Sequence, residues 1–92
     1  MKKYSFLLSK RAKKELGKLD KSVQSLIVSW IRKNIKDSSD PRVHGKALTG
    51  DKKGYWRYRV GNYRIIAEIN DDEFIIIAVT IAHRSEVYEK SR

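Results

Sequence analysis

Cysteine is absent from this sequence of 92 residues, and proline occurs only once. The absence of cysteine excludes a disulfide framework and a thiolate metal site, and it suits a chain that works in a reducing cytoplasm. Because a chain this short buries only a modest hydrophobic core, we expect a single domain over residues 1–92.

Long hydrophobic runs are absent as well. No apolar stretch approaches the roughly 20 residues that a membrane-spanning helix needs. Residues 1–8 start with basic side chains, but Lys10 and Arg11 follow after only a short apolar stretch. We therefore interpret this segment as a strand rather than a signal peptide, and we expect a cytoplasmic protein with no membrane partner.

Acidic residues are few. The chain has 11 Asp and Glu and 21 Lys and Arg, which give it a net charge of +10. The first 36 residues hold 11 basic and 2 acidic side chains and form a basic coat. So much positive charge on a small protein favours a polyanionic partner. Nucleic acid is the first choice, ahead of an anionic membrane or an acidic protein.

Several catalytic motifs are also missing. The sequence has no Walker loop, no Gly-rich dinucleotide motif, no Ser-His-Asp order and no CxxC pair. Its carboxylates lack the close spacing of a two-metal nuclease, and Asp71, Asp72 and Glu73 indicate an exposed turn. We expect neither a metal nor a small-molecule cofactor.

The first half of the chain predicts a strand and two helices. Tyr4–Leu8 is a short apolar run typical of a strand, and Ser9 is a suitable cap for the helix that follows. After Asp20, apolar residues recur with helical spacing. They are Val23, Leu26, Ile27, Trp30, Ile31 and Ile35. Pro41 and the polar residues before it end this helix, and we expect a loop from residue 37 to about residue 54.

The second half of the chain predicts strands. Tyr55–Val60 and Tyr63–Ile69 alternate with a period of two, and Gly61–Asn62 between them is a two-residue hairpin turn. Phe74–Ile81 is nearly continuous in Ile, Val and Ala and predicts a strand buried on both faces. The expected fold is α+β, with an N-terminal strand, two helices packed on one face of an antiparallel sheet of about four strands, and a short C-terminal tail or helix.

The hairpin turn determines which side chains share a face of the sheet. With this turn, Arg59 lies opposite Arg64, and Arg57 lies opposite Ile66. One face then carries a polar set: Tyr55, Arg57, Arg59 and Arg64. Like charges directly across a strand pair are destabilising, so three arginines there favour a phosphate site. The alternative is the ordinary solvated face of a basic protein.

The end of the last strand adds two candidates, His83 and Arg84. A two-residue turn at residues 71–72 would pair Arg64 with Val79. His83 would then lie on the arginine face, whereas a three-residue turn would place it on the other face. A single histidine is often only a surface or packing residue, so both candidates are kept.

These residue types suit a nuclease that works without metal. RNA carries its own nucleophile in the 2′-hydroxyl, and arginines can hold the scissile phosphate while His or Tyr moves protons or stacks a base. Such an enzyme would leave a cyclic phosphate and would not act on DNA.

Two segments resemble the signature of the RelE/ParE toxin superfamily, and specifically of its RelE branch. They are residues 55–66, YWRYRVGNYRII, and residues 83–88, HRSEVY. Upstream, residues 40–42 (DPR) and 45–48 (GKAL) are similar to that branch too. The resemblance covers essentially the whole chain.

The resemblance implies a toxin of a type II toxin–antitoxin pair, a metal-independent endoribonuclease that cuts mRNA in the A site of the 30S ribosomal subunit and is neutralised by a RelB-like antitoxin. It implies that Arg64 contacts the scissile phosphate and that Tyr88 stacks on a base. Arg84, or His83 beside it, falls where the family places its general acid. The implied catalytic set is Arg57, Arg59, Arg64, His83, Arg84 and Tyr88. The implied RNA-binding set is Lys46, Lys52, Lys53 and Tyr55.

The chain departs from the family at two positions, because Arg57 and Arg59 stand where the best-studied members carry lysines. A lysine amine can give up its proton in a strongly positive site, whereas a guanidinium cannot act as a base at ordinary pH. The two arginines are then electrostatic stabilisers, and His83 is the best titratable candidate for base or acid.

Two other functions stay open. ParE-like relatives share the scaffold and poison DNA gyrase without cutting RNA, although they usually lack the full arginine set with a terminal tyrosine. A basic RNA-binding module would bind RNA and cleave nothing. In the RelE-like hypothesis the basic helices steer the protein to ribosomal RNA and accept an acidic, partly disordered antitoxin segment.

Overall fold

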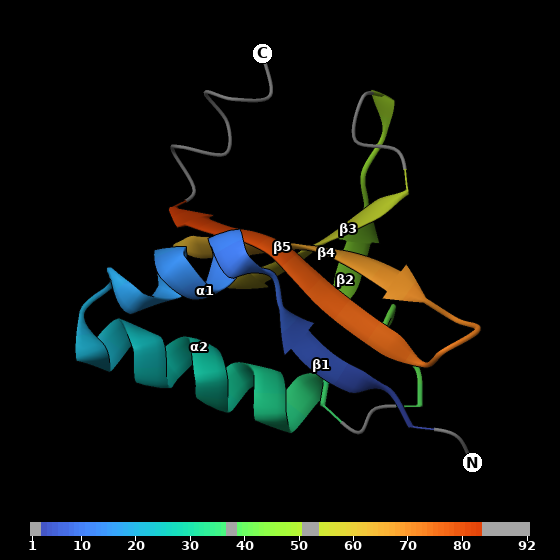
Figure 1. Ribbon diagram of the computed structural model, residues 1–92, viewed down its shortest axis with the longest axis horizontal. Coiled ribbons are helices and arrows are strands. Elements are labelled where there is room, and N and C mark those ends of the chain that lie inside the picture. Colours follow the sequence, from blue (N-terminus) through green and yellow to red (C-terminus); the bar gives the residue numbers. More distant parts are fainter. Residues whose placement is uncertain (1–2, 37–38, 51–53, 84–92) are drawn as a thin grey trace.

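The computed structural model describes residues 3–36, 39–50 and 54–83. Its elements in chain order are β1 (Ser5–Leu8), α1 (Lys10–Gly17), α2 (Lys21–Asn34), β2 (Gly45–Ala47), β3 (Tyr55–Val60), β4 (Tyr63–Asn70) and β5 (Ile75–His83). The sheet has the order β1-β5-β4-β3-β2, and both helices lie on one side of it (Figure 1). The prediction of an α+β fold with two helices on one face of a mostly antiparallel sheet is confirmed.

The structure differs from the prediction at the two edge strands. The stretch expected to be a loop contains the short strand β2, which pairs with the free edge of β3. β1 runs parallel to β5, whereas the other neighbouring strands are antiparallel. Both features depend on tertiary pairing. The three residues of β2 are too few to show an alternating pattern, and a local sequence pattern does not indicate whether β1 pairs in parallel.

Ser9 caps helix α1, and the helix lies against part of the edge of β5. The Ser9 hydroxyl oxygen accepts a hydrogen bond from the Ala12 N–H at 3.0 Å. Farther along the helix, the Glu15 carboxylate accepts hydrogen bonds from the Thr80 hydroxyl at 2.7 Å and the Ile81 N–H at 3.0 Å. Burial opposes ionisation of Glu15, but these hydrogen bonds outweigh it and lower the pKa of the carboxyl. Helix α1 thus provides hydrogen-bond acceptors for β5 where β1 has ended.

Helix α2 packs its apolar stripe against the sheet. Ile27 and Ile31 are buried, and the Trp30 ring lies 5.9 Å from the ring of Tyr58 on β3. Asp20 occupies the N-cap position of α2, but its side chain makes no capping hydrogen bond. Among the described residues, neither helix is long and apolar enough to cross a membrane. The buried core contains Tyr4, Ala12, Ile27, Ile31, Ile35, Tyr58, Val60, Ile65, Ala67, Ile76, Ala78 and Ile81.

The segment before β2 is anchored on Tyr58. The Tyr58 side chain is fully buried, burial raises its pKa to about 12, and its hydroxyl donates to the Pro41 carbonyl. Gly45 of β2 lies directly opposite Tyr58, and an added Cβ at Gly45 would sit 2.9 Å from the Tyr58 ring. The absence of a side chain at Gly45 therefore lets β2 lie against the ring.

A second anchor joins the same segment to the β4–β5 turn. Arg42 makes two hydrogen bonds to the Asp71 carboxylate, at 3.0 and 2.8 Å, and its guanidinium lies 5.4 Å from the centre of a Trp56 ring. The Tyr4 hydroxyl donates to the same carboxylate at 2.7 Å. These hydrogen bonds, from Arg42 first and then Tyr4, lower the pKa of Asp71.

The contact between Gly45 and Tyr58 predicts opposite effects of one substitution at two glycines. Gly45→Ala should lower the free energy of unfolding by about 1–3 kcal/mol, because a buried ring has no room to retreat. Gly17→Ala should be neutral or stabilise the fold by up to about 1 kcal/mol. Gly17 is the last residue of α1, a Cβ there would have open space around it, and alanine favours the helix more than glycine does. Denaturant unfolding of both variants measures this, and equal stabilities would contradict the tight fit.

The Arg42–Asp71 contact predicts an acid-sensitive part of stability. A carboxyl whose folded pKa lies below its ordinary value of 3.8 stabilises the fold above that pH and stops doing so as pH falls through the folded value. Asp71→Asn should therefore be less stable than the natural chain at pH 7, and the gap should shrink below about pH 4. Unfolding curves from pH 7 to 2 test this, with Asp72→Asn as the control in the same turn. A gap that stays constant with pH would contradict the assignment.

Candidate functional site

The face of the sheet that points away from the helices carries four basic side chains from three strands. Arg59 of β3 lies directly opposite Arg64 of β4, as predicted. Lys46 of β2 lies directly opposite Arg57 of β3. Directly opposite residues of antiparallel strands share a face, and Tyr58 between the two β3 arginines points into the core. We call Lys46, Arg57, Arg59 and Arg64 the cationic face.

The members of the cationic face differ in exposure. Lys46 and Arg59 are exposed, Arg57 is partly buried, and Arg64 is only 1% exposed. Arg64 is the one buried charged side chain among the residues that the structure describes. Arg64 therefore forms the floor of the cationic face, and Lys46 and Arg59 are its solvent-facing part.

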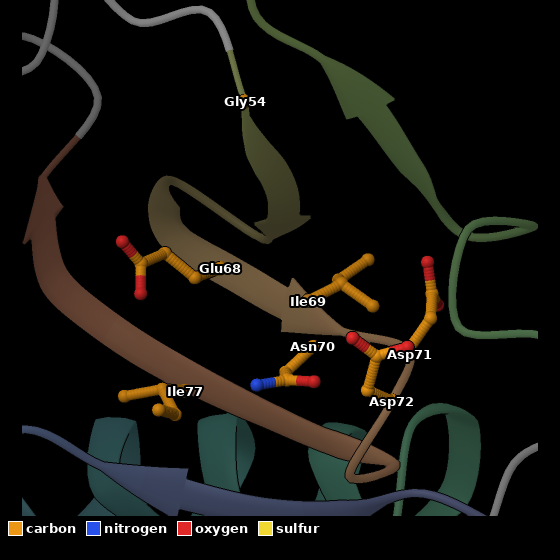
Figure 2. A pocket seen from close by; sticks show the side chains of 7 residues that line it. All are labelled: Gly54, Glu68, Ile69, Asn70, Asp71, Asp72 and Ile77. Carbon is orange, nitrogen blue, oxygen red and sulfur yellow. The ribbon is translucent and has the colours of Figure 1, made fainter.

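The next row of the same face is aromatic, acidic and aliphatic. Glu68 of β4 lies opposite Tyr55 of β3 on one side and Ile77 of β5 on the other. Glu68 and Ile77 help line an open depression of about 460 Å³ that also includes Gly54, Ile69, Asn70, Asp71 and Asp72 (Figure 2). The predicted hairpin pairing places Tyr55 on this face. The same register places Glu68 opposite Tyr55, but Glu68 was not among the predicted site residues.

His83 lies on the face that the three-residue turn would give it, but four residues, 71–74, connect the two strands, so neither of the two turn lengths considered is right. Asn70 pairs with Ile75, and a register shift between Ile66 and Ala67 follows, so Arg64 lies opposite Ala82 rather than Val79. His83 pairs with Tyr63, and their rings meet edge to face at 5.3 Å. Tyr63 packs against the core, so the His83 ring lies on the side of the sheet opposite the cationic face.

The other predicted site residues lie outside the described part of the chain. They are Lys52, Lys53, Arg84 and Tyr88. Within residues 3–36, 39–50 and 54–83, no group of three His, Asp or Glu side chains could hold a metal ion.

The arrangement suits the binding of a phosphodiester. Guanidinium groups bind phosphate oxygens with paired hydrogen bonds, and an amine adds a point charge beside them. An aromatic ring in the next row offers a stacking surface for an unpaired base. The cationic face and its neighbouring row together match the chemistry of a single-stranded nucleic acid.

A protein of similar sequence is a toxin. Toxin RelG from Mycobacterium tuberculosis is 24% identical over 87 residues, which are 95% of this chain and 98% of that protein.

Several solved structures share the fold. The toxin–antitoxin complex RelBE2 from Mycobacterium tuberculosis gives a TM-score of 0.82 at 24% identity, over 92% of this chain and 95% of that one. The isolated E. coli RelE toxin gives a TM-score of 0.71 at 22% identity, over 96% of this chain and 94% of that one. The RelE–RelB complex from Pyrococcus horikoshii gives a TM-score of 0.68 at 24% identity, over 90% of this chain and 97% of that one.

The family assignment comes from the sequence. Residues 6–88 match the family described as the ParE toxin of the type II toxin–antitoxin system parDE. This match spans most of the chain, and the fold agrees with it. The chain therefore belongs to the ParE toxin family of type II toxin–antitoxin systems, within the RelE/ParE superfamily.

Proposed function

We propose that this toxin is a metal-independent endoribonuclease that acts in the cytoplasm on mRNA in the ribosomal A site, with residues 1–92 as one catalytic domain. The observation that carries the proposal is the cationic face, where Lys46 faces Arg57 and Arg59 faces Arg64. Like charges directly across strands disfavour the sheet, and a phosphodiester bound beside the two pairs would give their placement a function.

The arginines would act on charge rather than on protons. Attack by the 2′-hydroxyl on the adjacent phosphorus builds negative charge on the phosphate oxygens, and fixed guanidinium groups stabilise that charge. Arg59 and Arg57 would hold the phosphate from the open side, and Arg64 would hold it from the floor. Tyr55 offers a surface for a neighbouring base, and Lys46 extends the positive track along the backbone.

The C-terminal residues complete the proposal. Arg84 and His83 remain the candidates for protonating the leaving 5′-oxygen, and Tyr88 the candidate for stacking on a base. In the described structure the His83 ring contacts Tyr63 instead of the cationic face, so His83 would act only after that contact opens. Lys52 and Lys53 would add phosphate contacts beside Lys46.

The proposed partner that silences the toxin is a RelB-like antitoxin. Support comes from relatives whose structures are complexes of RelE-type toxins with RelB. The first 36 residues, with 11 basic and 2 acidic side chains, offer a surface that an acidic antitoxin segment could cover. The same charge would steer the free toxin to the ribosome.

Substitutions on and off the cationic face test the proposal. At saturating ribosome concentration, Arg59→Ala and Arg64→Ala should each slow mRNA cleavage roughly 100-fold or more, because each removes a stabiliser of the developing charge. Arg32→Ala on α2 also removes one guanidinium, but it should weaken ribosome affinity, most at low salt, without lowering the saturated rate. The measurement is single-turnover cleavage on programmed ribosomes, with the 2′,3′-cyclic phosphate detected at the new end.

Two results would contradict the ribonuclease proposal. One is a natural chain that leaves mRNA intact on ribosomes, and the other is an Arg59→Ala variant with an unchanged rate. Because Arg64 is buried, circular dichroism and thermal unfolding must show that its variant is folded, and the exposed Arg59 serves as the safer site.

Inhibition of DNA gyrase is the second candidate function, and the family description, the ParE toxin of parDE, favours it. A gyrase inhibitor would block DNA supercoiling by the purified enzyme and would leave mRNA uncut. The ribonuclease remains our proposal, because a phosphate-binding face has no evident part in blocking gyrase.

A further inference from the structure

Cleavage by 2′-hydroxyl attack needs a group that takes the hydroxyl proton, and three of the four side chains of the cationic face cannot. A guanidinium has no accessible neutral form at ordinary pH, so Arg57, Arg59 and Arg64 are excluded. The His83 ring lies on the other side of the sheet. The Lys46 amine would first have to lose its own proton, so a carboxylate beside these arginines is the stronger candidate for the proton acceptor.

Glu68 has the right position. It shares the face with Arg57, because Arg57 lies opposite Ile66 and Glu68 stands two residues farther along β4. Diagonal neighbours of this kind have Cα atoms about 7–8 Å apart, a span that a glutamate and an arginine side chain can close from both ends. A phosphate held by Arg57 would thus leave its ribose near the Glu68 carboxylate.

The carboxylate of Glu68 is also available. Glu15 is held by Thr80 and Ile81, and Asp71 is held by Arg42 and Tyr4. Glu68, by contrast, is exposed, and no hydrogen bond or ion pair joins its carboxylate to another residue of the described ranges.

The surroundings of Glu68 fit a nucleoside. Figure 2 shows its side chain directed away from Asp71 and Asp72, which lie at the opposite end of the depression. Tyr55 and Ile77 flank Glu68 on the adjacent strands and could contact the flat faces of a base or a ribose. Arg57 lies diagonally across from Glu68 on β3, and Asp71 and Asp72 line the same depression.

We propose that Glu68 is the general base of the ribonuclease reaction, an inference that rests on the proposed function. A carboxylate oxygen of Glu68 takes the proton of the 2′-hydroxyl while the bond from that oxygen to phosphorus forms. The bond from phosphorus to the 5′-oxygen breaks, and the leaving oxygen takes a proton from water or from an acid at the site. The products are a 2′,3′-cyclic phosphate and a 5′-hydroxyl, and Glu68 returns its proton to water.

The competing explanation is that Glu68 only balances the charge of Arg57. The two roles predict different effects of Glu68→Gln, which keeps the shape and removes the negative charge. If Glu68 balances charge, the variant binds RNA at least as tightly and cleaves at an undiminished rate. If Glu68 is the base, the variant binds as tightly but cleaves roughly 100- to 10,000-fold more slowly.

The experiment measures single-turnover cleavage on programmed ribosomes at saturating toxin and neutral pH, together with ribosome affinity. For Glu68→Gln we expect unchanged or tighter binding and a rate at least 100-fold lower. Glu68→Asp keeps a carboxylate on a shorter arm and should recover part of the rate. Asp72→Asn removes the same charge from the same depression and should cleave at the natural rate.

The outcomes separate this inference from the proposal on which it rests. If the natural chain cleaves mRNA and Glu68→Gln cleaves within about threefold of it, Glu68 is not the base, while the ribonuclease function stands. A Glu68→Asp variant as slow as Glu68→Gln would also overturn the role. If the natural chain does not cleave mRNA at all, the proposed function and this inference fail together.

Discussion

The two-residue turn at Gly61 and Asn62 is the constraint on which the rest of this structure depends. Gly61 has a φ of 59°, a conformation that glycine adopts without strain, and the turn pairs Val60 with Tyr63. Every cross-strand partner between β3 and β4 follows from that pair. A slip of one residue would turn Arg57 and Arg59 toward the helices and expose Tyr58, so the turn defines core and site at once.

The cationic face is held by contacts on the other side of the sheet. Pairs of like charges directly across β2, β3 and β4 disfavour the sheet. The opposing stabilisation comes from Tyr58, which packs on Trp30 and Gly45 and donates to the Pro41 carbonyl. The Arg42–Asp71 contact adds a link between the segment before β2 and the turn that ends β4. The cost of gathering positive charge on one face is thus offset by the buried contacts of Tyr58 and by the exposed Arg42–Asp71 ion pair.

Local pattern predicted most of the fold and three of the four members of the cationic face. The alternation of Tyr55–Val60 and the Gly61–Asn62 turn gave the pairing of Arg59 with Arg64 without any tertiary information. Lys46 opposite Arg57 could not be predicted as a pair, because β2 exists only through its pairing with β3. The position of His83 depended on a register shift between Ile66 and Ala67, and no turn residue or glycine marks that shift in the sequence. Glu68 could have been found, since the register of the hairpin reaches it.

The contact between Glu15 and β5 has a consequence for how the protein behaves in a crowded cell. A strand edge with unsatisfied N–H groups is a template on which a second chain can build more sheet, the first step of aggregation. Past the end of β1 this edge is met by a helix, and a carboxylate accepts the Ile81 N–H. The two outermost strands have only four and three residues, which leaves little ladder for a neighbour. Together these features disfavour edge-to-edge association of copies made in excess.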